Sequence, residues 1–344
     1  RSRGMEPMVT LFHFSSPLWL AAQGGWRDPG VIAHFRRFVR YTVEQLGDLV
    51  SLWCTINEPN IYAALGYLLG EHAPGEHSLF LYFRVLRHLL QAHAAAYRTI
   101  RALDGGAQVG LVKSVVMFEA LNEQDRSSYC LAGLMDSLFN EVTLRAVHDG
   151  RLGPPLRCIP GTYGALMDST DFVGVNYYSR QRVSLRSSNG GRMALLSLTP
   201  GAETSDEGRN GPYGEVYPAG LYQALRRVAR LGKPIYVTEN GLPDDDDDQR
   251  PRFLLSHLAH MQRAIADGID VRGYYHWTFT DNFEWAEGWG LRFGLVALDP
   301  ETQQRTPRPS AQLYSDIIRE NAISPEMVSK YAPELATDLF EQAR

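Results

Sequence analysis

Apolar runs of strand length alternate with helical patterns along nearly the whole chain. Six short apolar runs are predicted to be strands; they span residues 8–14, 49–57, 108–116, 171–178, 234–238 and 271–277. The segments between them favour helices; these span residues 29–46, 79–103, 127–148, 252–265 and 310–320. Residues 187–212 are rich in Gly and Ser and are expected to form a loop.

The first predicted helix has apolar residues at helical spacing and a capping residue before it. Ile32, Phe35 and Val39 recur at three- and four-residue steps, which predicts that one face of the helix is buried. Asp28 is predicted to be the N-cap of this helix and Pro29 its first residue.

Repeated strand–helix alternation predicts a mainly parallel sheet. Polar residues at the carboxyl ends of several strands favour a (β/α)₈ TIM barrel, whose active site lies at those ends. A doubly wound sheet is the alternative, but the chain has no G-x-G-x-x-G or Walker A pattern. A barrel needs eight strands and six are recognised, so about two βα units are expected to be missing before Arg1.

Composition narrows the function classes. The chain has 344 residues, of which 44% are hydrophobic and 21% charged, so a large core is expected and disorder is not. A formal net charge of −5 argues against a nucleic-acid partner and fits a neutral small-molecule substrate. No apolar stretch approaches the roughly 18 residues of a membrane span, so no membrane partner is expected.

Two further residue groups invite a metal hypothesis that their spacing does not favour. Cys54, Cys130 and Cys158 lack metal-binding spacing, and they are expected to be reduced, buried thiols in a cytoplasmic protein. The acidic run 244–248 lacks the alternation of a calcium loop. It is expected to be a solvated loop whose last acids complement a helix N-terminus.

Two glutamates stand at the ends of predicted strands in distinctive contexts. Glu58 lies in the run Thr-Ile-Asn-Glu-Pro, and Glu239 lies in the run Val-Thr-Glu-Asn-Gly. A strand that ends on a carboxylate and then breaks at Pro or Gly holds that carboxylate at the mouth of a sheet. Two such strand ends can bring two acids to one substrate, and paired carboxylates are what glycosidic bond cleavage requires.

Both contexts are similar to the two signatures of glycoside hydrolase family 1, the retaining β-glucosidases and β-galactosidases. The resemblance continues in the family's order through residues 11–14, 174–178, 276–285, 292–295 and 305–311. Residues 250–333 are most similar to archaeal and thermophile-type β-glycosidases. The resemblance implies a barrel catalytic domain over residues 1–320, and a C-terminal extension, residues 321–344, that packs on the barrel.

The resemblance also implies a chemistry: a retaining exo-β-glycosidase that releases glucose, galactose or fucose and needs no cofactor and no metal. Glu58 would be the acid/base and Glu239 the nucleophile, about 5–5.5 Å apart. An apolar wall or the charge of Glu239 should raise the pKa of Glu58. Asn57 would donate to the sugar 2-hydroxyl, and Tyr178 would hold the nucleophile in line.

Sugar binding is carried over from the same resemblance. Glu284 would hold the 4- and 6-hydroxyls of the terminal sugar. The other substrate-binding residues implied are His13, Asn176, Trp277, Trp285 and Phe293. Indole faces suit the C–H face of a pyranose. Phospho-glycosidases of the family replace this Glu with Ser and add a Lys, whereas residues 281–292 keep Glu and contain no Lys. An unphosphorylated β-glycoside or oligosaccharide is therefore the expected partner.

The chain departs from the family pattern at its start. The family's first two strands bring a glutamine that contacts the sugar and an arginine beside the nucleophile, and neither is present. Three explanations stay open: a fragment of a longer gene, missing strands supplied by a separate chain, or a shortened variant. An open barrel would expose two strand edges and promote association, so a homo-oligomer or a complementing N-terminal segment is expected. A truncated, catalytically impaired sugar-binding or scaffold protein is the alternative function.

Overall fold

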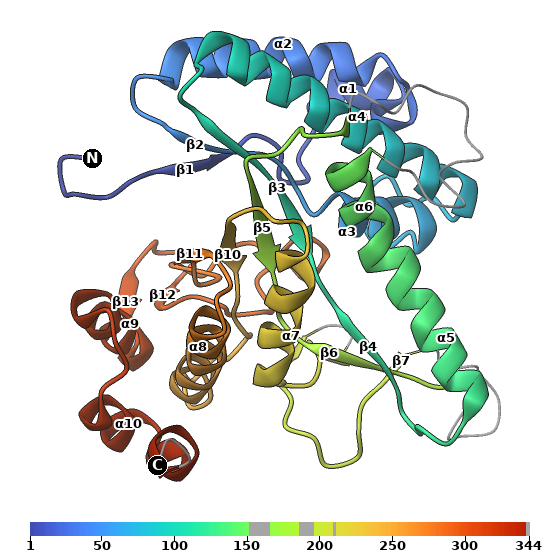
Figure 1. Cartoon of the computed structure of the whole chain (residues 1–344). Helices are drawn as coiled ribbons and strands as arrows, with labels where there is room; N and C mark the ends of the chain where they lie inside the picture. Colours follow the sequence, from blue (N-terminus) through green and yellow to red (C-terminus); the bar gives the residue numbers. More distant parts are fainter. Residues whose placement is uncertain (151–165, 186–195, 209–210, 342–344) are drawn as a thin grey trace. The chain divides into compact units, whose positions relative to one another are not determined.

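The computed structural model describes residues 1–150, 166–185, 196–208 and 211–341. Within this part, the main sheet has six strands in the order β1-β2-β3-β5-β10-β11 (Figure 1). Their bounds are β1 Met8–Thr10, β2 Leu52–Asn57, β3 Gln108–Ser114, β5 Phe172–Asn176, β10 Ile235–Glu239 and β11 Val271–Tyr274. Each of the six predicted strands therefore corresponds to one strand of this sheet.

Two compact units divide the chain. Unit 1 comprises Arg1–Val115, Ser137–Asn176 and Val228–Tyr236, and unit 2 comprises Val116–Asp136, Tyr177–Arg227 and Val237–Arg344.

In unit 1, β1, β2, β3 and β5 pair in parallel. Gly110 of β3 lies opposite Phe172 of β5. A Cβ atom at Gly110 would lie 2.3 Å from the Phe172 ring, so this position needs glycine. The hydrogen bonds between β1 and β2 continue beyond Thr10, because the Asn57 N–H donates to the Phe12 carbonyl at 2.9 Å. This continuation aligns the carboxyl ends of the two strands.

Helices α2 (Val31–Leu46) and α4 (Leu79–Leu103) belong to unit 1. The predicted apolar face of α2 is confirmed, since Val31, Phe35, Val39 and Val43 are buried. The predicted cap is wrong. Gly30 is the N-cap, and the Asp28 carboxylate instead accepts the Gly30 N–H at 2.7 Å. This bond forms a turn before the helix, as Asp side chains commonly do.

The segment predicted as one helix over residues 127–148 is interrupted. Helix α5 (Arg126–Asp136) is followed by a π-helical turn, Ser137–Glu141, and then by α6 (Val142–Asp149). Such single π-helical turns occur within α-helices, so the pattern located the helical segment but not its interruption.

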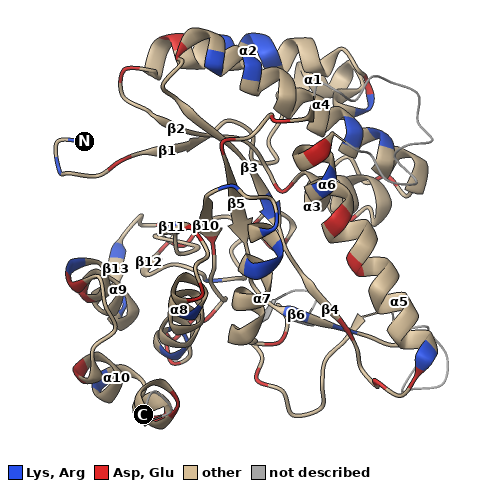
Figure 2. Ribbon diagram, viewed as in Figure 1, with Lys and Arg blue, Asp and Glu red and all other residues tan. Residues whose placement is uncertain are grey.

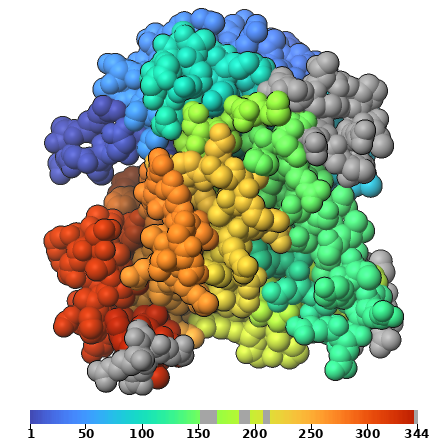
Figure 3. Space-filling view, in the orientation of Figure 1, coloured from blue at the N-terminus to red at the C-terminus, as the bar shows by residue number. Residues whose placement is uncertain are grey.

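Unit 2 contains the helices α8 (Arg250–Ala266), α9 (Pro309–Glu320) and α10 (Pro325–Tyr331). Leu254 and Leu255 of α8 form a core cluster with Leu313 of α9 and with Met327 and Val328 of α10. Helices α9 and α10, drawn in red, lie at the surface of the face that Figure 3 shows.

Other elements were not predicted individually. The helices are α1 Leu18–Ala22, α3 Pro59–Ala63 and α7 Pro218–Ala229. The shorter turns are Gly25–Arg27, Ala64–Leu68, Trp285–Glu287, Pro333–Leu335 and Thr337–Glu341. The short strands are β4 Met117–Ala120, β6 Arg180–Val183, β7 Leu196–Ser197, β8 Glu207–Gly208, β9 Gly211–Pro212, β12 Val296–Leu298 and β13 Arg305–Pro307. The expected loop 187–212 thus contains the short strands β7, β8 and β9, and part of it lies outside the described residues.

Surface charge, helix hydropathy and cysteine exposure can be compared with what the composition predicted. Arg36, Arg37 and Arg40 lie on the exposed side of α2, where Figure 2 shows blue. Within the described part of the chain, no helix combines the length and hydropathy needed to cross a membrane. Cys54 is buried as predicted, but Cys130 is exposed, which corrects the expectation for that thiol; Cys158 lies outside the described residues.

Candidate active site

Glu58 ends β2 and begins a helix. Its backbone is left-handed, with φ of 42°, and it is the N-cap of α3, with Pro59 as the first helical residue. Its N–H donates to the Val112 carbonyl at 2.9 Å, and its carbonyl accepts the Tyr62 N–H at 3.0 Å. A left-handed non-glycine residue costs on the order of 1–3 kcal/mol. The surrounding bonds therefore fix the direction in which this side chain leaves the strand.

The Glu58 carboxyl is buried among neutral hydrogen-bond donors, with only 7% of the residue exposed. Asn176 Nδ2 donates to Oε1 at 3.0 Å, and the Ser114 hydroxyl is a second partner. Burial raises the pKa of Glu58, while the bonds from Asn176 and Ser114 and the charge of Lys113 oppose that rise. The direction agrees with the predicted requirement for an acid that starts protonated.

Asn57 and His13 extend the same hydrogen-bonded group. Asn57 Nδ2 lies 3.1 Å from His13 Nε2, and Asn57 Oδ1 accepts from Asn176 at 3.1 Å. Burial lowers the pKa of His13 to about 4, so the ring is neutral near pH 7. The structure therefore brings together four of the predicted residues in unit 1, which are His13, Asn57, Glu58 and Asn176.

Glu239 ends β10 in unit 2 and is 8% exposed. The Tyr178 hydroxyl donates to Glu239 Oε2 at 2.5 Å. The backbone fixes this approach, because the Tyr177 N–H donates to the Glu239 carbonyl at 3.0 Å and Asn240 Nδ2 donates back to the Tyr177 carbonyl at 2.7 Å. A phenol bonded to a carboxylate is a charge-assisted hydrogen bond, which is stronger than one between neutral groups.

Aromatic rings surround Tyr178. Its ring centroid lies 5.4 Å from that of Tyr213 and 6.1 Å from that of Phe293, both at steep angles. Phe293 is 1% exposed, and its ring packs against the rings of Tyr178 and Tyr213. The structure therefore places Phe293 where it supports Tyr178, while its predicted contact with sugar stays a prediction.

The remaining predicted sugar-binding residues lie in unit 2. The backbone N–H of Trp277 donates to the backbone carbonyl of Asn240 at 3.0 Å. A Cβ atom at Gly241 would lie 1.8 Å from the backbone carbonyl oxygen of Trp277. This explains why glycine follows the Glu-Asn pair. Glu284 donates its N–H to the Gly288 carbonyl at 2.7 Å, and Trp285 has a φ of 45°. Trp277, Glu284 and Trp285 are all partly exposed.

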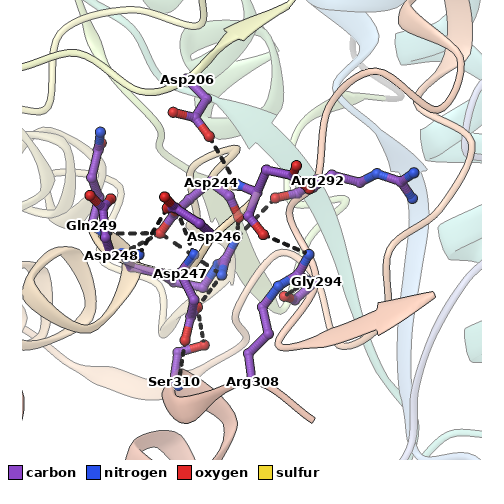
Figure 4. Close-up of polar contacts among 12 residues, drawn as sticks. Asp206, Asp244, Asp246, Asp247, Asp248, Gln249, Arg292, Gly294, Arg308 and Ser310 are labelled. Carbon is purple, nitrogen blue, oxygen red and sulfur yellow. Dashed lines mark hydrogen bonds and ion pairs between the residues drawn. The ribbon is translucent and has the colours of Figure 1, made fainter. Parts of the chain in front are cut away.

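The acidic run 244–248 differs from its prediction. Asp244 and Asp247 are buried, so the run is not simply a solvated loop. Figure 4 shows the hydrogen bonds and ion pairs of this run. Asp244 Oδ2 accepts the N–H groups of Gln249 and Arg250 at 3.0 and 2.7 Å, so the first acid, rather than the last ones, complements the start of α8. The sequence shows the charges of this run, but it does not show that Asp244 and Asp247 would be buried with Arg250.

This acidic run is also the place where a cation is conceivable. Carboxylate oxygens of Asp244, Asp246 and Asp248 lie within 4.8 Å of one another. Both oxygens of Asp244 already accept backbone N–H groups, and Arg250 donates to Asp247 and to the Asp244 carbonyl oxygen. These bonds account for the arrangement as a helix cap with a buried ion pair.

Two residues beside Glu58 were missed from the sequence. Ser114 and Lys113 close β3, and both act on the Glu58 carboxyl. A lysine inside the otherwise apolar run 108–116 was the available signal, because such runs seldom carry a charge without a reason.

Comparison with known proteins supports the resemblance. The family model of glycosyl hydrolase family 1 matches residues 1–323. A β-glycosidase from Pyrococcus horikoshii is 38% identical, with a TM-score of 0.84 over 96% of this chain and 75% of that one. A β-glucosidase from Thermotoga maritima in complex with glucoimidazole is 31% identical, with a TM-score of 0.84 over 94% and 76%.

A relative named for a different activity also matches. The chain is 34% identical over 344 residues to the galactolipid galactosyltransferase SFR2 of Arabidopsis thaliana. The aligned region covers 94% of this chain and 49% of that protein. The structural matches confirm the predicted α/β fold class of the (β/α)₈ type. With a family model matched over 323 of its 344 residues, the chain belongs to glycosyl hydrolase family 1.

Proposed function

We propose that the chain is a retaining exo-β-glycosidase that acts by double displacement. The observation that carries the proposal is the contrast between its two strand-end acids. Glu58 is buried among neutral donors with a raised pKa, and Glu239 accepts a 2.5 Å hydrogen bond from Tyr178. Two carboxyl groups in such different environments are suited to two different roles, one as the acid and the other as the nucleophile.

The first step breaks the glycosidic bond. Glu239 attacks the anomeric carbon with an oxygen lone pair, while Glu58 gives its proton to the departing oxygen. The products are a free alcohol, a glycosyl ester on Glu239 and an ionised Glu58. Tyr178 would stay bonded to Glu239 and keep the attacking oxygen in line.

The second step releases the sugar. Ionised Glu58 takes a proton from water, and the water oxygen attacks the anomeric carbon, which frees Glu239. Two inversions leave the sugar with its original β configuration. No cofactor or metal takes part.

The substrate proposed is an unphosphorylated β-glucoside, β-galactoside or β-fucoside. Glu284 would hold the 4- and 6-hydroxyls, Trp277 and Trp285 would pack on the ring, and His13, Asn57 and Asn176 would meet its other hydroxyls. The relative bound to glucoimidazole supports a glucose-like ligand. We propose a cytoplasmic location on the basis of free thiols such as Cys54.

The stereochemistry of the first product tests this proposal. The sugar released from an aryl β-glucoside would be followed by proton NMR within minutes, before its anomers equilibrate. Initial formation of β-glucose is expected. Initial α-glucose would replace the retaining mechanism by an inverting one, and binding of glucose without any turnover would favour the sugar-binding or scaffold alternative.

Transfer to a sugar acceptor is a second candidate, favoured by the 34% identity to a galactosyltransferase. The glycosyl ester on Glu239 would then be attacked by a sugar hydroxyl in place of water, with Glu58 accepting that proton. The protein would be incubated with a galactoside donor and a galactolipid acceptor, and the products would be analysed by mass spectrometry. A digalactosyl product exceeding free galactose supports transfer, and free galactose alone refutes it.

Assembly is the third proposal. Strand β1 ends the order of the main sheet, and the neighbouring helix α2 exposes Phe38 and Tyr41, at 49% and 65%. Among the described residues no strand pairs with the outer edge of β1. Such an edge beside exposed aromatic residues favours association, so we propose a homo-oligomer or a complementing N-terminal segment. Light scattering of the purified chain should show more than one copy, or co-expression with such a segment should increase turnover; a fully active monomer would refute both.

A further inference from the structure

Asn240 follows the proposed nucleophile directly in the chain, and the proposed mechanism does not use its side chain. The residue has no exposed surface. A buried amide destabilises the fold unless its N–H and oxygen groups find partners. The partners of this amide lie at the carboxyl ends of β5 and β11, the two strands on either side of β10 in the main sheet. They therefore indicate what the side chain holds together.

The amide nitrogen of Asn240 bonds the segment that follows β5. Nδ2 donates to the Tyr177 carbonyl at 2.7 Å, and the Tyr177 N–H donates to the Glu239 carbonyl at 3.0 Å. Tyr177 is itself held, because it has no exposed surface and its hydroxyl donates to the Tyr217 carbonyl at 2.7 Å. The next residue, Tyr178, donates to Glu239 Oε2 at 2.5 Å. The backbone bonds and the phenol–carboxylate bond therefore form one connected group.

The amide oxygen of Asn240 bonds the end of β11. Tyr274 is the last residue of that strand, and its hydroxyl donates to Asn240 Oδ1 at 2.9 Å. The same hydroxyl lies 3.4 Å from the backbone carbonyl oxygen of Asn240. Burial raises the pKa of Tyr274, so the hydroxyl keeps the proton that it donates. Tyr314 of α9 holds Tyr274 in turn, because its hydroxyl donates to the Tyr274 carbonyl at 3.2 Å.

These two partners leave the Asn240 amide one favourable orientation. A carbonyl oxygen only accepts hydrogen bonds, so the Tyr177 carbonyl requires the Nδ2 side of the amide. A rotated amide would place Oδ1 against that carbonyl, and two acceptors repel each other. The Tyr274 hydroxyl supplies the donor that Oδ1 needs in the observed orientation. Without that hydroxyl, a buried oxygen would lose its donor, which favours displacement of the amide.

We propose that Asn240 is a positioning residue that keeps the Tyr178 hydroxyl against Glu239, and that Tyr274 holds the Asn240 amide in the orientation this requires. The proposal rests on the proposed function, in which Glu239 attacks the anomeric carbon. Asn240 and Tyr274 exchange no proton in this role. Asn240 acts through the backbone of Tyr177, so a displaced amide lets Tyr178 move away from the carboxylate. The attacking oxygen is then less well aligned.

The direct test is a carbon-13 NMR measurement of the Tyr178 ring in the full chain. Tyrosine labelled at Cζ, the carbon that bears the hydroxyl, would be incorporated, and the Tyr178 signal assigned by its loss in Tyr178→Phe. Tyr274→Phe keeps its ring and removes only the hydroxyl, so it should shift the Tyr178 signal. Tyr222→Phe, which removes a hydroxyl bonded to Asp267 at 2.7 Å, should leave that signal in place. An unmoved Tyr178 signal in folded Tyr274→Phe overturns the proposal.

Kinetics provide a readout that a merely structural role would not move. Tyr274→Phe should lower kcat about 3- to 10-fold with little change in KM, because alignment of the carboxylate acts in the transition state. Added to Tyr178→Phe, the same substitution should lower kcat less than about twofold, since the contact that it supports is already absent. Independent losses that multiply in the double variant overturn the proposal, as does wild-type kcat in folded Tyr274→Phe. A wild-type protein that hydrolyses no aryl β-glycoside would refute the proposed function, while the Tyr178 signal would still decide whether Tyr274 acts on this contact.

Discussion

Glu58 and Glu239 leave their strands in similar sequence contexts, but the structure gives them different surroundings. Glu58 lies in unit 1 against an amide and a hydroxyl, on a left-handed backbone. Glu239 lies in unit 2 against the hydroxyl of Tyr178, within a group of aromatic rings. Both residues are less than a tenth exposed. Burial alone therefore does not distinguish the two acids, and their hydrogen-bond donors do.

The largest effect should follow removal of the nucleophile. Glu239→Gly should lower hydrolysis by about 10⁴-fold or more, because no glycosyl ester can form. The variant should still join sugars from an α-glycosyl fluoride, since Glu58 can act as base toward an acceptor. Thin-layer chromatography and initial rates measure both. Normal hydrolysis by this variant would exclude Glu239 as the nucleophile.

Removal of the acid should produce a smaller effect that depends on the substrate. Glu58→Ala should lower kcat/KM by about 10²- to 10⁴-fold for alkyl glucosides and much less for dinitrophenyl glucosides. Glu320→Ala, at an exposed position, is the control. The raised pKa of Glu58 also places the alkaline limb of the wild-type pH profile above the ordinary glutamate range, because activity requires the protonated form. A limb unchanged in Glu58→Gln would assign it to another group.

The Tyr178 hydroxyl tests the environment of Glu239 specifically. Tyr178→Phe keeps the ring packing on Phe293 but removes the 2.5 Å bond, so kcat should fall by about 10- to 100-fold. The free energy of unfolding should change little. Tyr129→Phe, at a tyrosine that is 67% exposed, should match the wild type in both measurements. A Tyr178→Phe variant with wild-type kcat would show that this bond does not orient the nucleophile.

Asp244 shows that a buried acid need not be catalytic. Burial raises the pKa of Asp244 as it does that of Glu58, but Arg250 and the first N–H groups of α8 surround it. Arg250→Met should lower the free energy of unfolding by about 3–5 kcal/mol, because it leaves buried carboxylates without their cation. Arg272→Met, at an exposed pair, should cost less than about 1 kcal/mol.

Chemical denaturation measures both arginine variants. The alkaline limb of the pH profile should not move in Arg250→Met at temperatures where it is folded. A shifted limb would show that this ion pair also contributes to catalysis.

The main sheet was readable from the sequence because each strand is a short apolar run, and α4 was predicted with its observed bounds. The two acids could be found because a strand end followed by Pro or Gly is a local signal. The cap of α2 could not, since Asp28 had two ways to bond the backbone. Lys113 and the Asp244–Arg250 pair were missed because their burial depends on residues distant in sequence, such as Asn140 and Arg292.

We propose that Glu58 and Glu239 act on one sugar. Folded protein would be incubated with a 2-deoxy-2-fluoro-β-glucoside that carries a good leaving group, then digested and analysed by mass spectrometry. One fluoroglucosyl group per chain is expected, attached to Glu239. An adduct on another residue, or no adduct on folded protein that binds the sugar, would contradict it.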